Sequence, residues 1–197
     1  MPKPIDQRER EELSALLVEL GPDAPTLCAG WSAFDLAAHL TLREHFHRWG
    51  DARMAAAKRQ GFPAVVARVE RGAPFFPWRI PKLRNLLNGT EFFIHHEDLR
   101  RANGLTRRAD RADLDRMSWR MLGFLGRRLS HAVGPFGLEL RTPSGESRRF
   151  GSSPAVVITG QPTELLLYAS GRRSAAEVVI GGPSVAVAAL EHAHVRL

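Results

Sequence analysis

Apolar residues recur at every third or fourth position through most of the first 134 residues, and this spacing is typical of amphipathic helices. The first stripe consists of Leu13, Leu16, Leu17 and Leu20, and Gly21-Pro22 ends it. In the next helix Ser32 is the expected cap. The predicted helices cover residues 5–20, 32–59, 64–71, 82–103 and 112–131. Four of them are long, and with their apolar stripes facing inward they would form a bundle.

The pattern changes after Gly134, where alternating and β-branched residues replace helical spacing. Pro143-Ser144-Gly145-Glu146 has the composition of a hairpin turn between two short strands. The predicted elements are strands at 138–142, 147–150, 155–159 and 177–180 and helices at 162–170 and 184–193. The predicted fold class is therefore α+β, with a four-helix bundle in residues 1–134 and a small α/β domain in residues 135–197.

Three metal-binding side chains occur on the predicted helices. Glu91 and His95 lie one helical turn apart on the same face, and His39 lies on an earlier helix. Two histidines and one carboxylate can hold a divalent cation and leave a coordination position open. The alternatives are a buried His39 bonded to a backbone carbonyl and an exposed Glu91–His95 pair. Phe92-Phe93-Ile94 argues against exposure, and unpaired buried charge is costly.

Neighbouring polar residues are expected to support these ligands. Asp98 lies three residues after His95 and could orient its imidazole, while His96 points about 100° away and is expected to pack or to act as a supporting group. Asp35 bears the same relation to His39, although a capping role with Ser32 competes evenly. Cys28, the single cysteine, would need a nearby base to act as a nucleophile.

Charge and hydropathy narrow the function classes. The net charge is +7, but 25 of the 28 basic residues are Arg and they alternate with acids, which favours a solvated surface over a polyanion site. Apolar runs fall short of the roughly 18 to 20 residues that span a bilayer, and the polar start has no signal-peptide core. We therefore expect a cytoplasmic protein without membrane association.

Two segments together resemble the DinB-like superfamily of metal-binding four-helix bundles, in the branch typified by mycothiol-dependent maleylpyruvate isomerase. The first segment is Cys28-Ala29-Gly30-Trp31-Ser32 followed by Asp35-Leu36-Ala37-Ala38-His39-Leu40. The second runs from Glu91 to Leu99 and matches a Glu-x-x-x-His-His-x-Asp-Leu pattern. The resemblance is closer to an actinobacterial subgroup of that branch, so the maleylpyruvate reaction itself is not carried over.

This resemblance implies that His39, Glu91 and His95 are metal ligands. It also extends to Val156–Gly160 and Leu165–Arg172, which are similar to the sterol-carrier-like domain that follows the bundle in that branch. An arginine of that domain has a catalytic part in the family, and Arg172 is the matching position. Zinc is the first candidate for the cation, and nickel, manganese and iron are also compatible with these ligands.

The leading hypothesis is a metal-dependent transferase or isomerase that joins a low-molecular-weight thiol, with mycothiol as the candidate, to a small electrophile. A bound cation would lower the pKa of the thiol, and Arg172 would hold a carboxylate or developing negative charge. The main alternative is a noncatalytic module that binds a metal and a small ligand. A nucleic-acid-binding protein is the weaker alternative. The sequence indicates neither the electrophile nor the oligomeric state.

Overall fold

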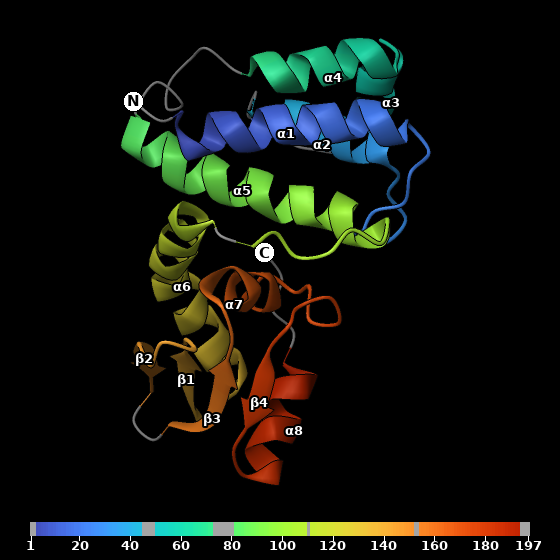
Figure 1. Ribbon diagram of the computed structural model, residues 1–197. Coiled ribbons are helices and arrows are strands. Elements are labelled where there is room, and N and C mark those ends of the chain that lie inside the picture. Colours follow the sequence, from blue (N-terminus) through green and yellow to red (C-terminus); the bar gives the residue numbers. More distant parts are fainter. Residues whose placement is uncertain (1–2, 45–49, 73–80, 110, 152–153, 194–197) are drawn as a thin grey trace. The chain divides into compact units, whose positions relative to one another are not determined.

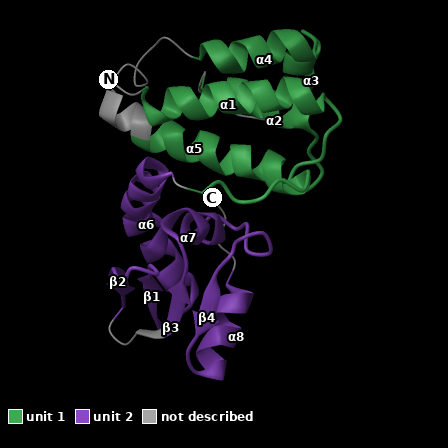
Figure 2. Ribbon diagram, in the orientation of Figure 1, with its two compact units in different colours: residues 1–109 green, residues 110–197 purple. Residues whose placement is uncertain are grey.

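The computed structural model describes residues 3–44, 50–72, 81–109, 111–151 and 154–193. The chain forms eight helices and a four-stranded sheet within these residues, so the predicted α+β class is confirmed (Figure 1). Contacts divide the chain into two compact units, residues 1–109 and 110–197 (Figure 2).

The first unit is helical. Its elements are α1 (Ile5–Leu20), α2 (Ala33–Glu44), α3 (Asp51–Lys58), α4 (Phe62–Arg71) and α5 (Pro81–Ala102). Helix α1 packs against α5 and α4, and α2 packs against α3 and α4. The predicted helix 32–59 is thus described as α2 and α3, and residues 45–49, including His45 and His47, lie outside the described residues.

Local chemistry explains where these helices begin and end. The Ser32 N–H and hydroxyl donate to the Asp35 carboxylate at 3.1 and 2.9 Å, which fixes the first turn of α2. Helix α1 stops at Gly21, whose φ of 84° lies in a region that side chains with a Cβ rarely adopt. The core of this unit joins α1, α2 and α5, and its fully buried residues include Leu13, Leu17, Leu36, Leu40, Phe92 and Leu99.

The second unit combines a sheet with three helices. It contains α6 (Ala112–Ala132), β1 (Gly137–Arg141), β2 (Ser147–Phe150), β3 (Pro154–Thr159), α7 (Pro162–Ala169), β4 (Val179–Gly181) and α8 (Ser184–His192). The strand order is β2-β1-β3-β4, in which β1 and β3 are parallel and both outer pairs are antiparallel. The predicted hairpin corresponds to β1 and β2.

The compact units divide before α6, whereas the sequence pattern predicted a domain boundary after it at residue 134. Helix α6 packs extensively against α7 and also contacts β1 and β2. At Gly126 an added Cβ would lie 2.5 Å from the Phe150 ring, so the missing side chain allows α6 and β2 to approach closely. The apolar stripe of α6 thus packs into the core of the second unit. A four-helix domain of residues 1–134 stays a prediction.

Candidate metal centre

His39 of α2 and the Glu91–His95 pair of α5 converge within the first unit. The Oε1 atom of Glu91 lies 3.6 Å from His39 Nε2 and 3.3 Å from His95 Nε2. The two imidazole centroids are 5.2 Å apart, and the three potential ligand atoms all lie within 4.8 Å of one another. The structure therefore brings together the three side chains that the sequence singled out, and their donor set fits a divalent cation.

The surrounding core holds these side chains in place. Leu36 and Leu40 flank His39 and belong to the same buried cluster as Phe92 and Leu99 of α5. His39 and His95 are 5% and 6% exposed, whereas the Glu91 side chain is 28% exposed, so solvent reaches the cluster at the carboxylate. The Trp31 ring, 4.9 Å from the His39 ring, packs against the imidazole.

The surroundings of the cluster favour an ionised Glu91 carboxylate and a neutral His39 imidazole. Burial would raise the pKa of Glu91, but hydrogen bonds to His39 and His95 and the nearby Arg43 hold that pKa well below its usual range. Burial lowers the pKa of His39 despite its contact with Glu91. A neutral His39 keeps a nitrogen lone pair for a cation. Arg43, whose Nε lies 3.2 Å from Glu91 Oε1, is a site residue that helical spacing did not reveal.

Asp98 contacts the opposite nitrogen of His95. Its Oδ2 atom lies 2.9 Å from His95 Nδ1, and the carboxylate is fully buried. Burial would lower the pKa of His95, but hydrogen bonds with Asp98, Cys28 and Glu91 raise it well above its usual value. The contact predicted from the three-residue spacing is present. A carboxylate in this position typically fixes the orientation of a metal-binding imidazole, and that role for Asp98 stays a prediction.

Cys28 also belongs to this neighbourhood, which its position in the sequence did not indicate. Its thiol donates to Asp98 Oδ2 at 3.2 Å, and its Sγ lies 3.9 Å from His95 Nδ1. The Leu27 N–H donates to the Asp98 carbonyl at 3.1 Å, so the loop before α2 is fastened to α5. The base that a nucleophilic Cys28 would require is therefore close.

Asp35 makes the capping contacts that competed with a role beside His39. Besides the Ser32 contacts, its Oδ1 accepts a hydrogen bond from Lys58 of α3 at 2.8 Å. Burial would raise the pKa of Asp35, but Lys58 and Ser32 lower it. The carboxylate thus joins the start of α2 to α3, and a supporting role toward His39 stays a prediction.

His96 points away from the candidate centre into a buried ionic cluster. Its Nδ1 lies 3.2 Å from Glu9 of α1, and Arg108 donates to both oxygens of Glu9 at 2.9 Å. Arg108 also donates to Glu97 at 2.9 Å and to Glu12 at 3.2 Å. These contacts tie α1 to α5 and to the segment that follows it. Glu9, Glu12 and His96 form another group of possible metal ligands. The positively charged Arg108 guanidinium already binds both of these carboxylates, so it takes the place of a metal cation.

Arg172, the predicted catalytic residue, belongs to the second unit. It follows α7, and its Nη1 donates to the Ser170 carbonyl at 2.8 Å. Its backbone N–H donates to the Leu167 carbonyl at 3.0 Å, which closes the end of the helix. A catalytic role for Arg172 stays a prediction.

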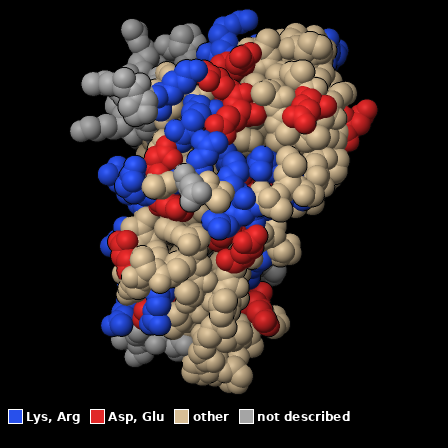
Figure 3. Space-filling model, in the orientation of Figure 1, with Lys and Arg blue, Asp and Glu red and all other residues tan. Residues whose placement is uncertain are grey.

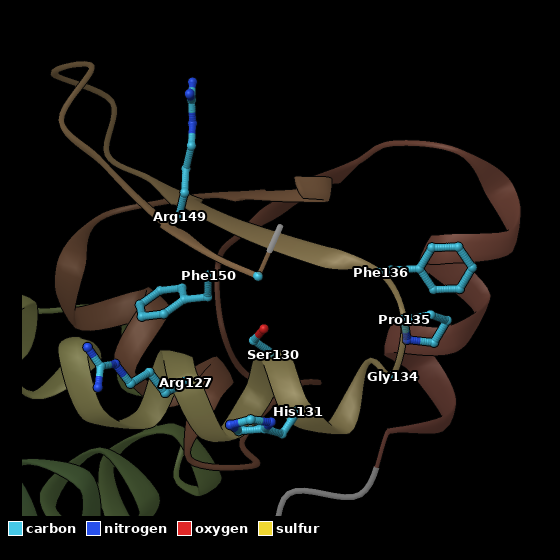
Figure 4. A pocket seen from close by; sticks show the side chains of 9 residues that line it. Arg127, Ser130, His131, Gly134, Pro135, Phe136, Arg149 and Phe150 are labelled. Atoms are coloured by element: carbon cyan, nitrogen blue, oxygen red, sulfur yellow. The ribbon is translucent and has the colours of Figure 1, made fainter. Parts of the chain in front are cut away.

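The second unit also contains a cavity of about 490 Å³ between the end of α6 and β2 (Figure 4). Phe136, Pro135 and Phe150 give it apolar walls, while Ser130 and His131 add polar groups from α6. Its remaining lining residues are Arg127, Gly134, Arg149 and Gly151. This volume is in the range of small-molecule sites, which are about 300–1,000 Å³.

The surface and the helices bear on the remaining function classes. On the face shown in Figure 3, basic and acidic side chains lie beside one another, as expected from their alternation in the sequence. None of the helices in the described residues combines the length and apolar character that crossing a membrane requires.

The fold is similar to that of two solved structures. A crystal structure of the mycothiol-dependent maleylpyruvate isomerase is 18% identical in sequence, with a TM-score of 0.53 and 90% of each chain covered. A crystal structure of a histidine-to-alanine mutant of the mycothiol-dependent maleylpyruvate isomerase is 17% identical, with a TM-score of 0.51 and the same coverage. No protein-family model matches the chain. The search of curated proteins also found no match. The chain therefore shares its fold with the isomerase.

Proposed function

We propose that this protein is a metal-dependent enzyme that uses a low-molecular-weight thiol, with mycothiol as the first candidate, to transfer or isomerise a small electrophile. The observation that carries the proposal is the convergence of His39, Glu91 and His95 within 4.8 Å, on helices held by a common core. The similarity of the fold to a mycothiol-dependent isomerase supports the choice of thiol.

Each residue of the centre has a distinct part. His39 and His95 would offer their Nε2 atoms and Glu91 a carboxylate oxygen, and Asp98 would keep the His95 ring oriented. A cation held there supplies a Lewis acid that lowers the pKa of a coordinated thiol. The partly exposed Glu91 marks the side from which a thiol can arrive. Arg172 is proposed to bind the negative charge of the electrophile through its planar guanidinium.

Metal analysis of protein purified without an affinity tag tests the centre. In the Cys28→Ser background we expect one divalent cation per chain, zinc first and nickel, manganese or iron next, and its loss in the His39→Ala/Cys28→Ser variant. His131→Ala/Cys28→Ser is the matched control, because His131 is an exposed histidine of α6 in the second unit. Equal metal contents in the Cys28→Ser and His39→Ala/Cys28→Ser variants would refute the proposed ligand set.

A thiol titration tests the chemistry. The cobalt-substituted Cys28→Ser variant carries no protein thiol, because the chain has a single cysteine. Added mycothiol should therefore produce a thiolate-to-cobalt absorption band that saturates, with loss of the band in His39→Ala/Cys28→Ser. A cobalt spectrum that excess mycothiol leaves unchanged would remove the mechanism.

The cavity beside β2 favours a second candidate function, a noncatalytic module that binds a small ligand. The apolar walls of this cavity, and the Arg and His side chains around them, suit an anion with an apolar body. Under this alternative the metal stabilises the helices, and the cobalt spectrum does not respond to thiol. Saturable binding of the fluorescent probe anilinonaphthalene sulfonate, weakened in Phe136→Ala, would support it.

A further inference from the structure

The two ring nitrogens of His95 face two different sets of metal-binding atoms. Nε2 lies 3.3 Å from Glu91 and belongs to the centre with His39. Nδ1 lies 2.9 Å from Asp98 Oδ2 and 3.9 Å from Cys28 Sγ, and these last two atoms are 3.2 Å apart. A thiol, an imidazole and a carboxylate thus converge on the side of the ring away from the first centre.

The dimensions of this second set suit a cation. The point equidistant from these three atoms is about 2 Å from each, close to the roughly 2.0–2.3 Å bonds of Zn²⁺ to nitrogen, oxygen and sulfur. Cys28 is half-buried and not in a disulfide, whereas Asp98 is fully buried. The loop that carries Cys28 is fastened to α5 by the Leu27–Asp98 backbone hydrogen bond, so the three donors come from segments held together.

Imidazole chemistry makes the two positions mutually exclusive. A neutral ring has one nitrogen with a lone pair and one that carries hydrogen. With a cation on Nε2, Nδ1–H donates to Asp98. With a cation on Nδ1, Nε2–H donates to Glu91. The surroundings of His95 therefore offer a hydrogen-bond acceptor for either tautomer.

We propose that Cys28, His95 and Asp98 form a second cation position, alternative to the His39–Glu91–His95 centre, that takes thiophilic divalent cations such as Cd²⁺. Binding to the metal-free chain replaces the thiol hydrogen by a sulfur–cation bond and the hydrogen on His95 Nδ1 by a nitrogen–cation bond. Both protons leave for solvent, while Nε2 keeps its hydrogen toward Glu91. Thiolate selects soft cations, whereas two imidazoles and a carboxylate also accept harder ones such as Mn²⁺. Zn²⁺ is borderline and can use either set. The cation that binds would then fix the tautomer of His95.

Cd²⁺ titration of the metal-free full-length chain tests this position. Because Cys28 is the only cysteine, an ultraviolet thiolate-to-cadmium band reports it alone. We expect the band to saturate at one Cd²⁺ per chain, to disappear in Cys28→Ser and to persist in His39→Ala. Asp98→Asn should weaken Cd²⁺ binding at least tenfold. Mn²⁺ binding, followed by electron paramagnetic resonance, should show the reverse dependence, with loss in His39→Ala and retention in Cys28→Ser.

Other results would overturn the proposal. Absence of a cadmium band means that Cys28 only donates to Asp98, and a band unaffected by Asp98→Asn means that the thiol binds Cd²⁺ outside this set. Binding of one Mn²⁺ and one Cd²⁺ to the same chain would contradict mutual exclusion. This second position shares His95 and Asp98 with the centre proposed above, but Cys28 has no part in that centre. Failure of the cobalt–mycothiol test in the Cys28→Ser background is therefore a separate result.

Discussion

Replacing Glu9 by Gln removes the centre of the buried ionic cluster that joins α1 to α5. Glu9 is fully buried and accepts two hydrogen bonds from Arg108 at 2.9 Å, and His96 Nδ1 lies 3.2 Å away. Burial alone would raise the pKa of Glu9, but the His96 hydrogen bond and the charge and hydrogen bonds of Arg108 lower it from 4.5 to about 2. Arg108 also donates to Glu12 and Glu97.

The shift in the Glu9 pKa sets the size of the effect. A difference of roughly 2.5 pKa units between the unfolded and folded chains corresponds to about 3 kcal/mol of stability at neutral pH. Because the pKa is lower in the folded protein, this contribution is complete above about pH 5 and falls as the pH decreases from 4.5 toward 2. The Gln variant should lack it, and a buried Arg108 without its main partner adds to the loss.

Urea unfolding of the wild-type protein and the Glu9→Gln variant between pH 7 and pH 3 measures this effect. We expect the variant to be about 3 kcal/mol or more less stable at pH 7, and the difference to shrink as the pH falls below 4.5. Glu11→Gln is the control on the same helix, because Glu11 is 43% exposed and pairs with Lys3 at the surface. Equal stabilities of the Glu9→Gln and Glu11→Gln variants at pH 7 would show that the buried Glu9 carboxylate does not stabilise the fold.

Three further substitutions test the packing and the centre. Gly126→Ala places a Cβ 2.5 Å from the Phe150 ring, so urea unfolding should show a loss of about 1–3 kcal/mol; unchanged stability would contradict the packing of α6 on β2. Phe92→Ala empties a fully buried core position and should cost about 3–5 kcal/mol by the same assay, and a loss below 1 kcal/mol would be inconsistent with that core. Asp98→Asn should weaken Mn²⁺ binding about 10- to 100-fold in a chelator competition, because it alters the hydrogen bond to His95; unaltered affinity would exclude its supporting role.

Local chemistry made much of the fold predictable from the sequence. The Ser32–Asp35 capping pair and Gly21 mark the start of α2 and the end of α1 at the expected positions. The turn around Ser144 and Gly145 separates the predicted strands, which correspond to β1 and β2. These signals depend on residues only a few positions apart, so the sequence shows them directly. The partner of α6 was not predictable, because an apolar stripe does not specify which surface covers it.

The candidate site shows the same division between local and distant contacts. Helical spacing alone placed Glu91 beside His95 and Asp98 near its other nitrogen. The approach of His39 depends on how α2 and α5 pack, so the residue types made it a hypothesis that the family resemblance then supported. The contact of Cys28 with Asp98 joins residues 70 positions apart through a loop, and no periodicity marks it. Arg43 is likewise aligned with Glu91 by the packing of two helices.

Anomalous diffraction from crystals of the full-length chain soaked in Mn²⁺ locates the bound cation and so tests whether His39, Glu91 and His95 are its ligands. We expect one peak within coordinate-bond distance of the Nε2 atoms of His39 and His95 and of an oxygen of Glu91, because these atoms already lie within 4.8 Å of one another. A cation bound without His39, or no anomalous peak among these three side chains at saturating Mn²⁺, would contradict this ligand set.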